Sequence, residues 1–182
     1  ELLPINPAAH YCMGGIKTNV SCETTLSNLY AVGECAQNGL HGANRIGGNS
    51  LLDIVTFGKI AGEHAEETSN TIENKEEKET IQFKNDTFFI NEVYKFSNQI
   101  NFYEKKEFMG KIFFKNVGLF RTDMNMKAVL QQLRQWQKEY NFMGIGDKSR
   151  SYNKNLVEFI EFGNMLELGE TVVVSAISRC ES

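Results

Sequence analysis

The spacing of apolar and polar residues separates a turn-rich first part of the chain from a helical remainder. In the first part, the short apolar runs over 16–20 and 29–32 predict two β-strands, the second of them a buried strand of the parallel kind. From about residue 50 to 67 the apolar spacing becomes helical, and Gly58 and Gly62 would permit close packing against a sheet. One side of this predicted helix carries Leu51, Leu52, Val55, Ile60 and Ala61.

Beyond residue 80 the pattern predicts helices. Segment 81–110 fits one or two of them, and Thr122 or Asp123 is a typical cap for the next. In that helix, apolar side chains recur at steps of three and four residues: Met126, Val129, Leu130, Leu133, Trp136 and Tyr140. A last helix is predicted over about 155–179, where the flanking period outweighs the β propensity of 172–174.

A charged run over 63–79 lies between the two parts. Blocks of like charge usually face solvent, so we expect an exposed helix end followed by a linker. We expect His64, among its glutamates, to be exposed as well. This places the predicted domain boundary after residue 67, with domains 1–67 and 68–182.

Composition excludes several classes of function. The 182 residues are 41% hydrophobic with a formal net charge of −4, which argues against a nucleic-acid or membrane-surface protein. No apolar run reaches membrane-spanning length. The four cysteines show no zinc or iron–sulfur spacing, and we expect reduced, mostly buried thiols.

The segment 40–52, LHGANRIGGNSLL, carries the strongest chemical signal. Its glycines let a ligand approach the backbone closely, and a helix starting at Asn49 or Ser50 would direct free N–H groups and a positive dipole end at that ligand. Arg45 adds a planar cationic fork that suits a carboxylate or phosphate. Together these features predict an anion-binding corner.

Several motifs resemble one family. They are PAAHYCMGGI at 7–16, LYAVGEC at 29–35 and HGANRIGGNSLLDIVTFGKIAG at 41–62, followed by VGLFRT at 117–122, DKSRSYN at 147–153 and FGNMLELGETVVVSAISRCES at 162–182. In this order they resemble the flavoprotein subunit of succinate dehydrogenases and fumarate reductases, with L-aspartate oxidase as a close relative. The resemblance spans nearly the whole chain and is weakest over 66–110.

The resemblance implies the fold class of an α+β fragment. It would comprise the returning part of a Rossmann-like FAD-binding domain and a truncated helical-bundle C-terminal domain. The family's glycine-rich dinucleotide fingerprint, its capping domain and its proton-delivering arginine have no counterpart here and are expected upstream of Leu2. As a piece by itself, the chain is expected to bind FAD weakly or not at all.

The resemblance also assigns site residues. His10 and Arg45 would be catalytic and would hold the dicarboxylate substrate; His41 would line the substrate site or support it structurally. The FAD-binding residues would be His10, Tyr11, Glu34, Arg45, Ile46, Gly47, Gly48, Asn49, Ser50 and Leu51. Glu34 is expected at the end of the strand over 29–32, where a carboxylate can accept hydrogen bonds from a ribose.

The implied function is FAD-mediated hydride transfer between succinate and fumarate. Electrons would be exchanged with an iron–sulfur subunit in a complex that has a membrane anchor or quinone-reactive subunit. The complex would lie on the inner membrane, on its cytoplasmic side or, in a related form, its periplasmic side. The short interval from His10 to Glu34 favours a fumarate reductase. L-aspartate oxidase and an inactive helical docking piece are the alternatives.

Overall fold

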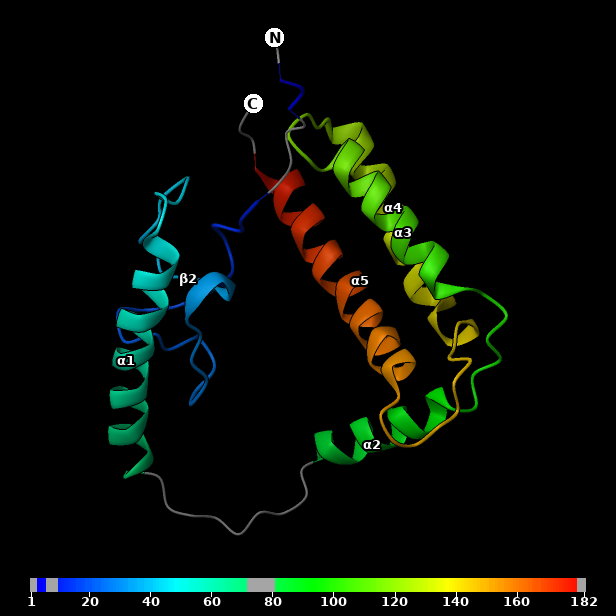
Figure 1. The fold of residues 1–182 in the computed structure, drawn as a ribbon, viewed down its shortest axis with the longest axis horizontal. Coiled ribbons are helices and arrows are strands. Elements are labelled where there is room, and N and C mark those ends of the chain that lie inside the picture. Colours follow the sequence, from blue (N-terminus) through cyan, green and yellow to red (C-terminus); the bar gives the residue numbers. More distant parts are fainter. Residues whose placement is uncertain (1–2, 6–9, 72–80, 180–182) are drawn as a thin grey trace. The chain divides into compact units, whose positions relative to one another are not determined.

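The computed structural model describes residues 3–5, 10–71 and 81–179 (Figure 1). They belong to two compact units: residues 10–71 form one, and 81–179, to which 3–5 are assigned, form the other. We call them the loop–helix unit and the helical unit. The predicted linker over 72–79 and the thiol of Cys180 lie outside the described residues.

The loop–helix unit has little regular structure apart from one long helix. Its strands β1 (Ile16–Lys17) and β2 (Ala36–Gln37) pair in parallel, and the 3-10 turn η1 (Gly33–Cys35) leads directly into β2. Helix α1 (Asn49–Ser69) then packs on η1. The prediction of a helix from about 50 to 67 is confirmed.

The strand predictions for this unit are largely wrong. Of segment 16–20 only the first two residues form a strand, and over 29–32 the backbone makes a single bridge, between Glu23 and Tyr30. Here the chain turns back on itself, since the Ala31 N–H donates to the Cys22 carbonyl at 3.1 Å. The apolar run therefore packs locally instead of entering a sheet, and Leu29 is 45% exposed.

Small residues let η1 and β1 approach their neighbours. Gly33 has φ +81°, and a Cβ there would lie 2.7 Å from Cγ2 of Ile54 on α1. Gly15 has φ +153°, and its Cβ would lie 2.4 Å from the Cys35 carbonyl oxygen. Both positions favour glycine because their φ values are positive, and because a Cβ would collide with the Ile54 side chain at Gly33 and with the Cys35 backbone at Gly15. They fix the loops around η1 against α1 and against β1.

The core of this unit is small, and the expected apolar face of α1 is only partly buried. Cys22, Ala31 and Ala61 are buried. In contrast, Leu51, Leu52 and Val55 are 70%, 65% and 70% exposed, so the predicted face is not covered within this unit. The thiol prediction also needs correction, because Cys12 and Cys35 are exposed and only Cys22 is buried among the described cysteines.

The helical unit consists of four helices: α2 (Ile81–Val93), α3 (Phe102–Asn116), α4 (Asp123–Glu139) and α5 (Lys154–Ser178). A 3-10 turn, η2 (Tyr140–Phe142), follows α4. The Thr122 side chain caps α4 by accepting the Asn125 N–H, as predicted, and the Asn153 side chain caps α5 by accepting the Leu156 N–H. The sequence predictions for all these helices are confirmed.

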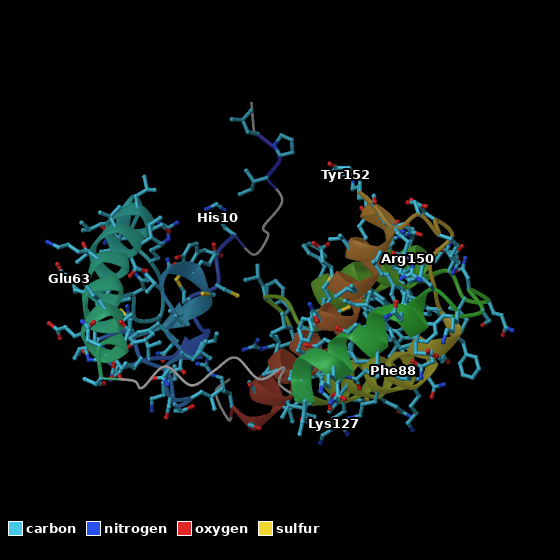
Figure 2. The ribbon with its side chains drawn as sticks, turned by 90° about the horizontal axis from the view of Figure 1, so that it is seen from below. His10, Glu63, Phe88, Lys127, Arg150 and Tyr152 are labelled. Atoms are coloured by element: carbon cyan, nitrogen blue, oxygen red, sulfur yellow. The ribbon has the colours of Figure 1, made fainter. Side chains whose placement is uncertain are left out.

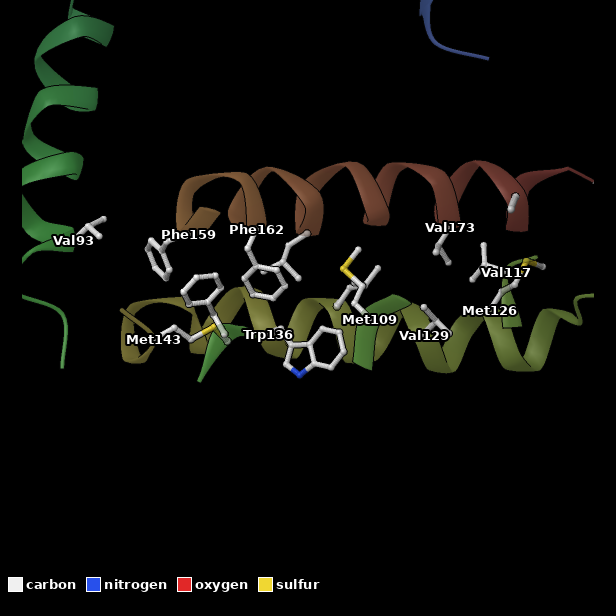
Figure 3. Packing of buried hydrophobic residues seen from close by; sticks show 14 of the residues in the cluster. Val93, Met109, Val117, Met126, Val129, Trp136, Met143, Phe159, Phe162 and Val173 are labelled. Atoms are coloured by element: carbon white, nitrogen blue, oxygen red, sulfur yellow. The ribbon is translucent and has the colours of Figure 1, made fainter. Parts of the chain in front are cut away.

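Figure 3 shows how the helical unit closes its core between α4 and α5. Leu133, Trp136, Phe159, Phe162 and Val173 are each at most 1% exposed. Two glycines of α5 permit its close packing against α3 and η2. A Cβ on Gly169 would lie 2.7 Å from Cε of Met109, and one on Gly163 would lie 2.6 Å from the Tyr140 hydroxyl.

Candidate functional site

The glycine corner before α1 is the feature that the sequence singled out, and the structure keeps it open. Gly48 is the N-cap residue, with φ +84°, and a Cβ at Gly47 or Gly48 would meet nothing within 4 Å. No side chain caps the helix, and its first turn carries no acidic residue. The first-turn N–H groups and the positive end of the helix dipole can therefore interact with an anion that approaches the start of the helix.

Arg45 lies at this corner and is half-buried. Its backbone N–H donates to Sδ of Met13 at 3.1 Å, and its Nη1 donates to the Ile46 carbonyl at 3.4 Å. The centre of the guanidinium lies 4.4 Å from the centroid of the Tyr11 ring. Nε is buried without a hydrogen-bond partner among the described residues, and no described carboxylate forms an ion pair with this arginine. The guanidinium therefore has no anionic partner among the described residues.

His41 is the second predicted site residue that contacts Tyr11. The two rings meet edge to face, with centroids 6.3 Å apart. The Nε2 of His41 lies 3.1 Å from Oδ2 of Asp53 on α1, and the two side chains are 10% and 3% exposed. With a carboxylate as partner, Nε2 must carry the proton and donate it. Of the two roles left open for His41, this geometry favours structural support.

Glu34 lies within η1, not at the end of a strand as predicted. Its Oε1 accepts the Cys12 N–H at 3.2 Å, which ties η1 to the segment after His10. One hydrogen bond leaves the exposed carboxylate with capacity for further donors.

His10 is exposed and belongs to the same loop as Tyr11 and Met13 (Figure 2). Because Tyr11 stacks on Arg45, the backbone of His10 lies one residue from the arginine's ring partner. The three stretches that carried the resemblance, around residues 10–13, 34 and 41–46, therefore meet in one place.

A hollow of about 430 Å³ opens beside this cluster. Its lining combines apolar and polar side chains, among them Leu40, His41, Asn44, Ile46, Asn49 and Asp53. Within the described residues, no group of three or more histidine, cysteine, aspartate or glutamate side chains is arranged to hold a metal ion.

Two polar contacts were not predicted from the sequence. Asp53 received no role from the sequence, although an aspartate inside the apolar run LLDIV is a signal that could have been followed. His64 was wrongly expected to be exposed. Its Nδ1 lies 2.9 Å from the Tyr30 hydroxyl, and its side chain is 32% exposed. It sits on the side of α1 that packs on the loop containing Tyr30, which helical spacing alone could not show.

Both parts of the chain match known protein families. Residues 2–51 match the family model described as "FAD binding domain", and residues 106–182 match the one described as "Fumarate reductase flavoprotein C-term". Across its whole length the chain is 37% identical to the fumarate reductase flavoprotein subunit of Escherichia coli. Both parts of the chain are thus similar to the flavoprotein subunits of fumarate reductases and succinate dehydrogenases.

Further members of the family show the same relationship. The succinate dehydrogenase flavoprotein subunit of Coxiella burnetii is 33% identical over 100% of this chain and 33% of its own length. A solved E. coli quinol fumarate reductase variant superimposes with a TM-score of 0.91 at 36% identity, over 100% of this chain and 31% of that chain. This agreement confirms the helical C-terminal part of the predicted fold.

The chain covers only part of its family relatives. It spans 30% of the length of the E. coli flavoprotein subunit. Among the described residues, no helix combines the length and the apolar character needed to span a bilayer.

Proposed function

We propose that the protein containing this chain is the flavoprotein subunit of a fumarate reductase or succinate dehydrogenase. It would transfer hydride between succinate and fumarate and exchange electrons with an iron–sulfur subunit. The observation that carries the proposal is Arg45, a half-buried guanidinium stacked on Tyr11 beside an open helix start and without a described acidic partner. The match to a fumarate reductase flavoprotein family model supports it.

We further infer that the two predicted domains correspond to the two units. The domain predicted over 1–67, the returning part of a Rossmann-like FAD-binding domain, would be the loop–helix unit, whose helix α1 extends to Ser69, and the domain predicted over 68–182 would be the helical unit. The matched family models support this division. The complex would be peripheral to the inner membrane, on its cytoplasmic side, and would include a membrane anchor or quinone-reactive subunit. The name of the matched E. coli structure, a quinol fumarate reductase, supports such an assembly.

The residues of the glycine corner fit FAD. The open space at Gly47 and Gly48 admits a flat ring system against the backbone, and the first-turn N–H groups of α1 favour negative charge near the helix start. The free acceptor capacity of Glu34 suits ribose hydroxyls. The residues proposed to hold the cofactor are His10, Tyr11, Glu34 and Arg45 together with Ile46, Gly47, Gly48, Asn49, Ser50 and Leu51. When bound, FAD supplies the hydride chemistry.

Arg45 and His10 would hold the substrate. A guanidinium can bind a carboxylate through two parallel N–H donors. In Arg45, Nε is buried and Nη1 already donates to the Ile46 carbonyl, so the N–H groups of Nη2 and the second N–H of Nη1 would serve as these donors. The His10 imidazole can donate a hydrogen bond to the other carboxylate. Two cationic or donor groups at the two ends of a dicarboxylate fix its orientation and withdraw electron density from the central carbons.

The test is fumarate reduction by the complete protein with a reduced viologen dye as donor. We expect Arg45→Ala to lower kcat/KM by about 10²–10³-fold or more while FAD remains bound, since removal of one charge-stabilising group has effects of this size. Arg45→Lys should retain only part of the wild-type kcat/KM, because an ammonium group cannot form the bidentate contact of a guanidinium.

Arg150 provides a matched control. Its guanidinium also stacks on a tyrosine, 4.2 Å from the Tyr94 centroid, but in the helical unit (Figure 2). Arg150→Ala should leave kcat/KM for fumarate unchanged. Near-normal activity of Arg45→Ala would refute the assignment of Arg45, and oxidation of L-aspartate without fumarate reduction would identify the protein as an L-aspartate oxidase instead.

A further inference from the structure

Asp53 is a buried carboxylate that the proposed dicarboxylate site does not account for. It is 3% exposed on α1, and Oδ1 has no hydrogen-bond partner among the described residues. Its one described hydrogen-bond partner is His41, 3.1 Å away. Burying a carboxylate is unfavourable unless its partner is well placed, so the imidazole of His41 is held in one orientation by this contact.

The contact between Asp53 and His41 is the first of three that connect Asp53 to Arg45. His41 meets the Tyr11 ring edge to face at 6.3 Å, with an interplanar angle of 88°. The face of the same Tyr11 ring carries the guanidinium of Arg45, 4.4 Å from its centroid. Asp53 is thereby linked to Arg45 through two aromatic rings, although the two residues do not touch in any described contact.

We propose that Asp53, His41 and Tyr11 are positioning residues that hold the Arg45 guanidinium ready for a carboxylate. We call the three residues the positioning array. An arginine side chain has several rotatable bonds, and fixing it before the ligand arrives reduces the conformational entropy lost on binding. The contact with Tyr11 is made over the ring and not through a hydrogen bond, so the array orients the cation without using its N–H donors.

This inference rests on the proposed function, and it is tested in the complete protein with fumarate as substrate. We expect Tyr11→Leu and Asp53→Ala each to raise KM for fumarate about tenfold, in line with the loss of a desolvated cation–π contact, while kcat changes much less. The dissociation constant of malonate, an unreactive dicarboxylate, should rise by the same factor in a calorimetric titration.

Conservative variants separate positioning from a general structural role. Tyr11→Phe keeps the ring face and should recover most of the loss seen in Tyr11→Leu. Asp53→Asn keeps an oxygen that can accept from His41 and should recover most of the loss seen in Asp53→Ala. These two variants also keep the test valid if Asp53→Ala fails to fold or loses its FAD.

Two control variants remove similar contacts elsewhere in the chain. Tyr94→Leu removes the ring under Arg150 in the helical unit, and His64→Ala removes the other tyrosine-bonded histidine of the loop–helix unit. Neither residue contacts Tyr11, His41 or Arg45 in the described structure. Both variants should leave KM for fumarate and malonate affinity unchanged.

The double variant Asp53→Ala with Tyr11→Leu tests the serial arrangement. If Asp53 acts through Tyr11, the double variant should weaken malonate binding by the same factor as Tyr11→Leu alone. If the two residues act independently, the factors of the two single variants would multiply. Effects that multiply in the double variant, or an unchanged malonate affinity in both single variants, would contradict the positioning role of the array. Neither result would contradict the proposed function. A wild-type protein that neither reduces fumarate nor binds malonate contradicts the proposed function and the array with it.

Discussion

The two units of this chain bury their apolar side chains to very different degrees. In the helical unit, large residues such as Trp136 and Phe159 are at most 1% exposed, and one core connects all four helices. In the loop–helix unit, the buried residues are small, and Leu51 and Leu52 at the start of α1 are mostly exposed. The contrast shows that the helical unit carries its own stabilising core, whereas the loop–helix unit mainly assembles polar and aromatic contacts around Arg45.

The contrast also separates two kinds of buried polar contact. In the helical unit, the Tyr140 hydroxyl donates to the Phe159 carbonyl at 2.8 Å, and burial raises the pKa of this phenol. That bond holds a helix end within a closed core. In the loop–helix unit, the His41–Asp53 pair lines a hollow, and His41 contacts Tyr11, the ring over which the Arg45 guanidinium lies. Only the second arrangement has the form of a binding site.

A pair of leucine truncations provides the strongest test of this contrast. In the 182-residue chain, Leu166→Ala on α5 should lower the free energy of unfolding by about 2–5 kcal/mol, because it removes a side chain that is 1% exposed and leaves a cavity. Leu52→Ala on α1, where the side chain is 65% exposed, should cost less than about 0.5 kcal/mol. Denaturant unfolding followed by circular dichroism gives both values. Equal losses would show that the units do not differ as described.

A pair of glycine substitutions examines the packing of the helical unit more finely. Gly169→Ala should destabilise it by about 1–3 kcal/mol, since the new methyl group would overlap Met109 and Phe113. Gly110→Ala on α3 has nothing within 4 Å of its Cβ and should stabilise the chain by about 0.5–1 kcal/mol through helix propensity. Thermal unfolding distinguishes them by opposite shifts in Tm. A rise in Tm for Gly169→Ala would mean that α5 packs more loosely than the structure indicates.

The smallest effect expected is a pH dependence at the surface of the helical unit. Glu170 accepts hydrogen bonds from Gln137 and Arg134, and these lower its pKa below the ordinary value of 4.5. A lowered folded-state pKa contributes stability that is present above about pH 4.5 and is lost as the pH falls through the folded-state value. Glu170→Gln should therefore flatten the acid side of the stability profile slightly. Urea unfolding between about pH 3 and 6 would measure this, and an unchanged slope would contradict it.

The success of the sequence predictions follows the same division between the units. The helices around Met126 and Leu166 were predictable because their apolar residues recur at helical spacing and their caps, Thr122 among them, are local. The strand over 29–32 was not, because a short apolar run becomes a strand only if a partner strand lies beside it, and here the chain pairs with its own turn at Cys22.

The site residues, too, were predictable only where the signal lies in neighbouring residues. Arg45 and the glycine corner stood out because unusual residue types lie together in the sequence. Asp53 and the half-buried state of His64 did not, since their partners His41 and Tyr30 are 12 and 34 residues away. Pairing over such intervals depends on how the loops fold over α1.

The amino-acid sequence by itself determined the helices of the chain, the open start of α1 and the similarity to the fumarate reductase and succinate dehydrogenase flavoprotein subunits, because each of these is encoded in neighbouring residues or in a contiguous motif. Only the tertiary structure decided that Tyr11 lies between His41 and Arg45 and that Asp53 is buried against His41. The physical reason is that such contacts form between side chains distant in sequence, so they depend on how the loops fold over α1.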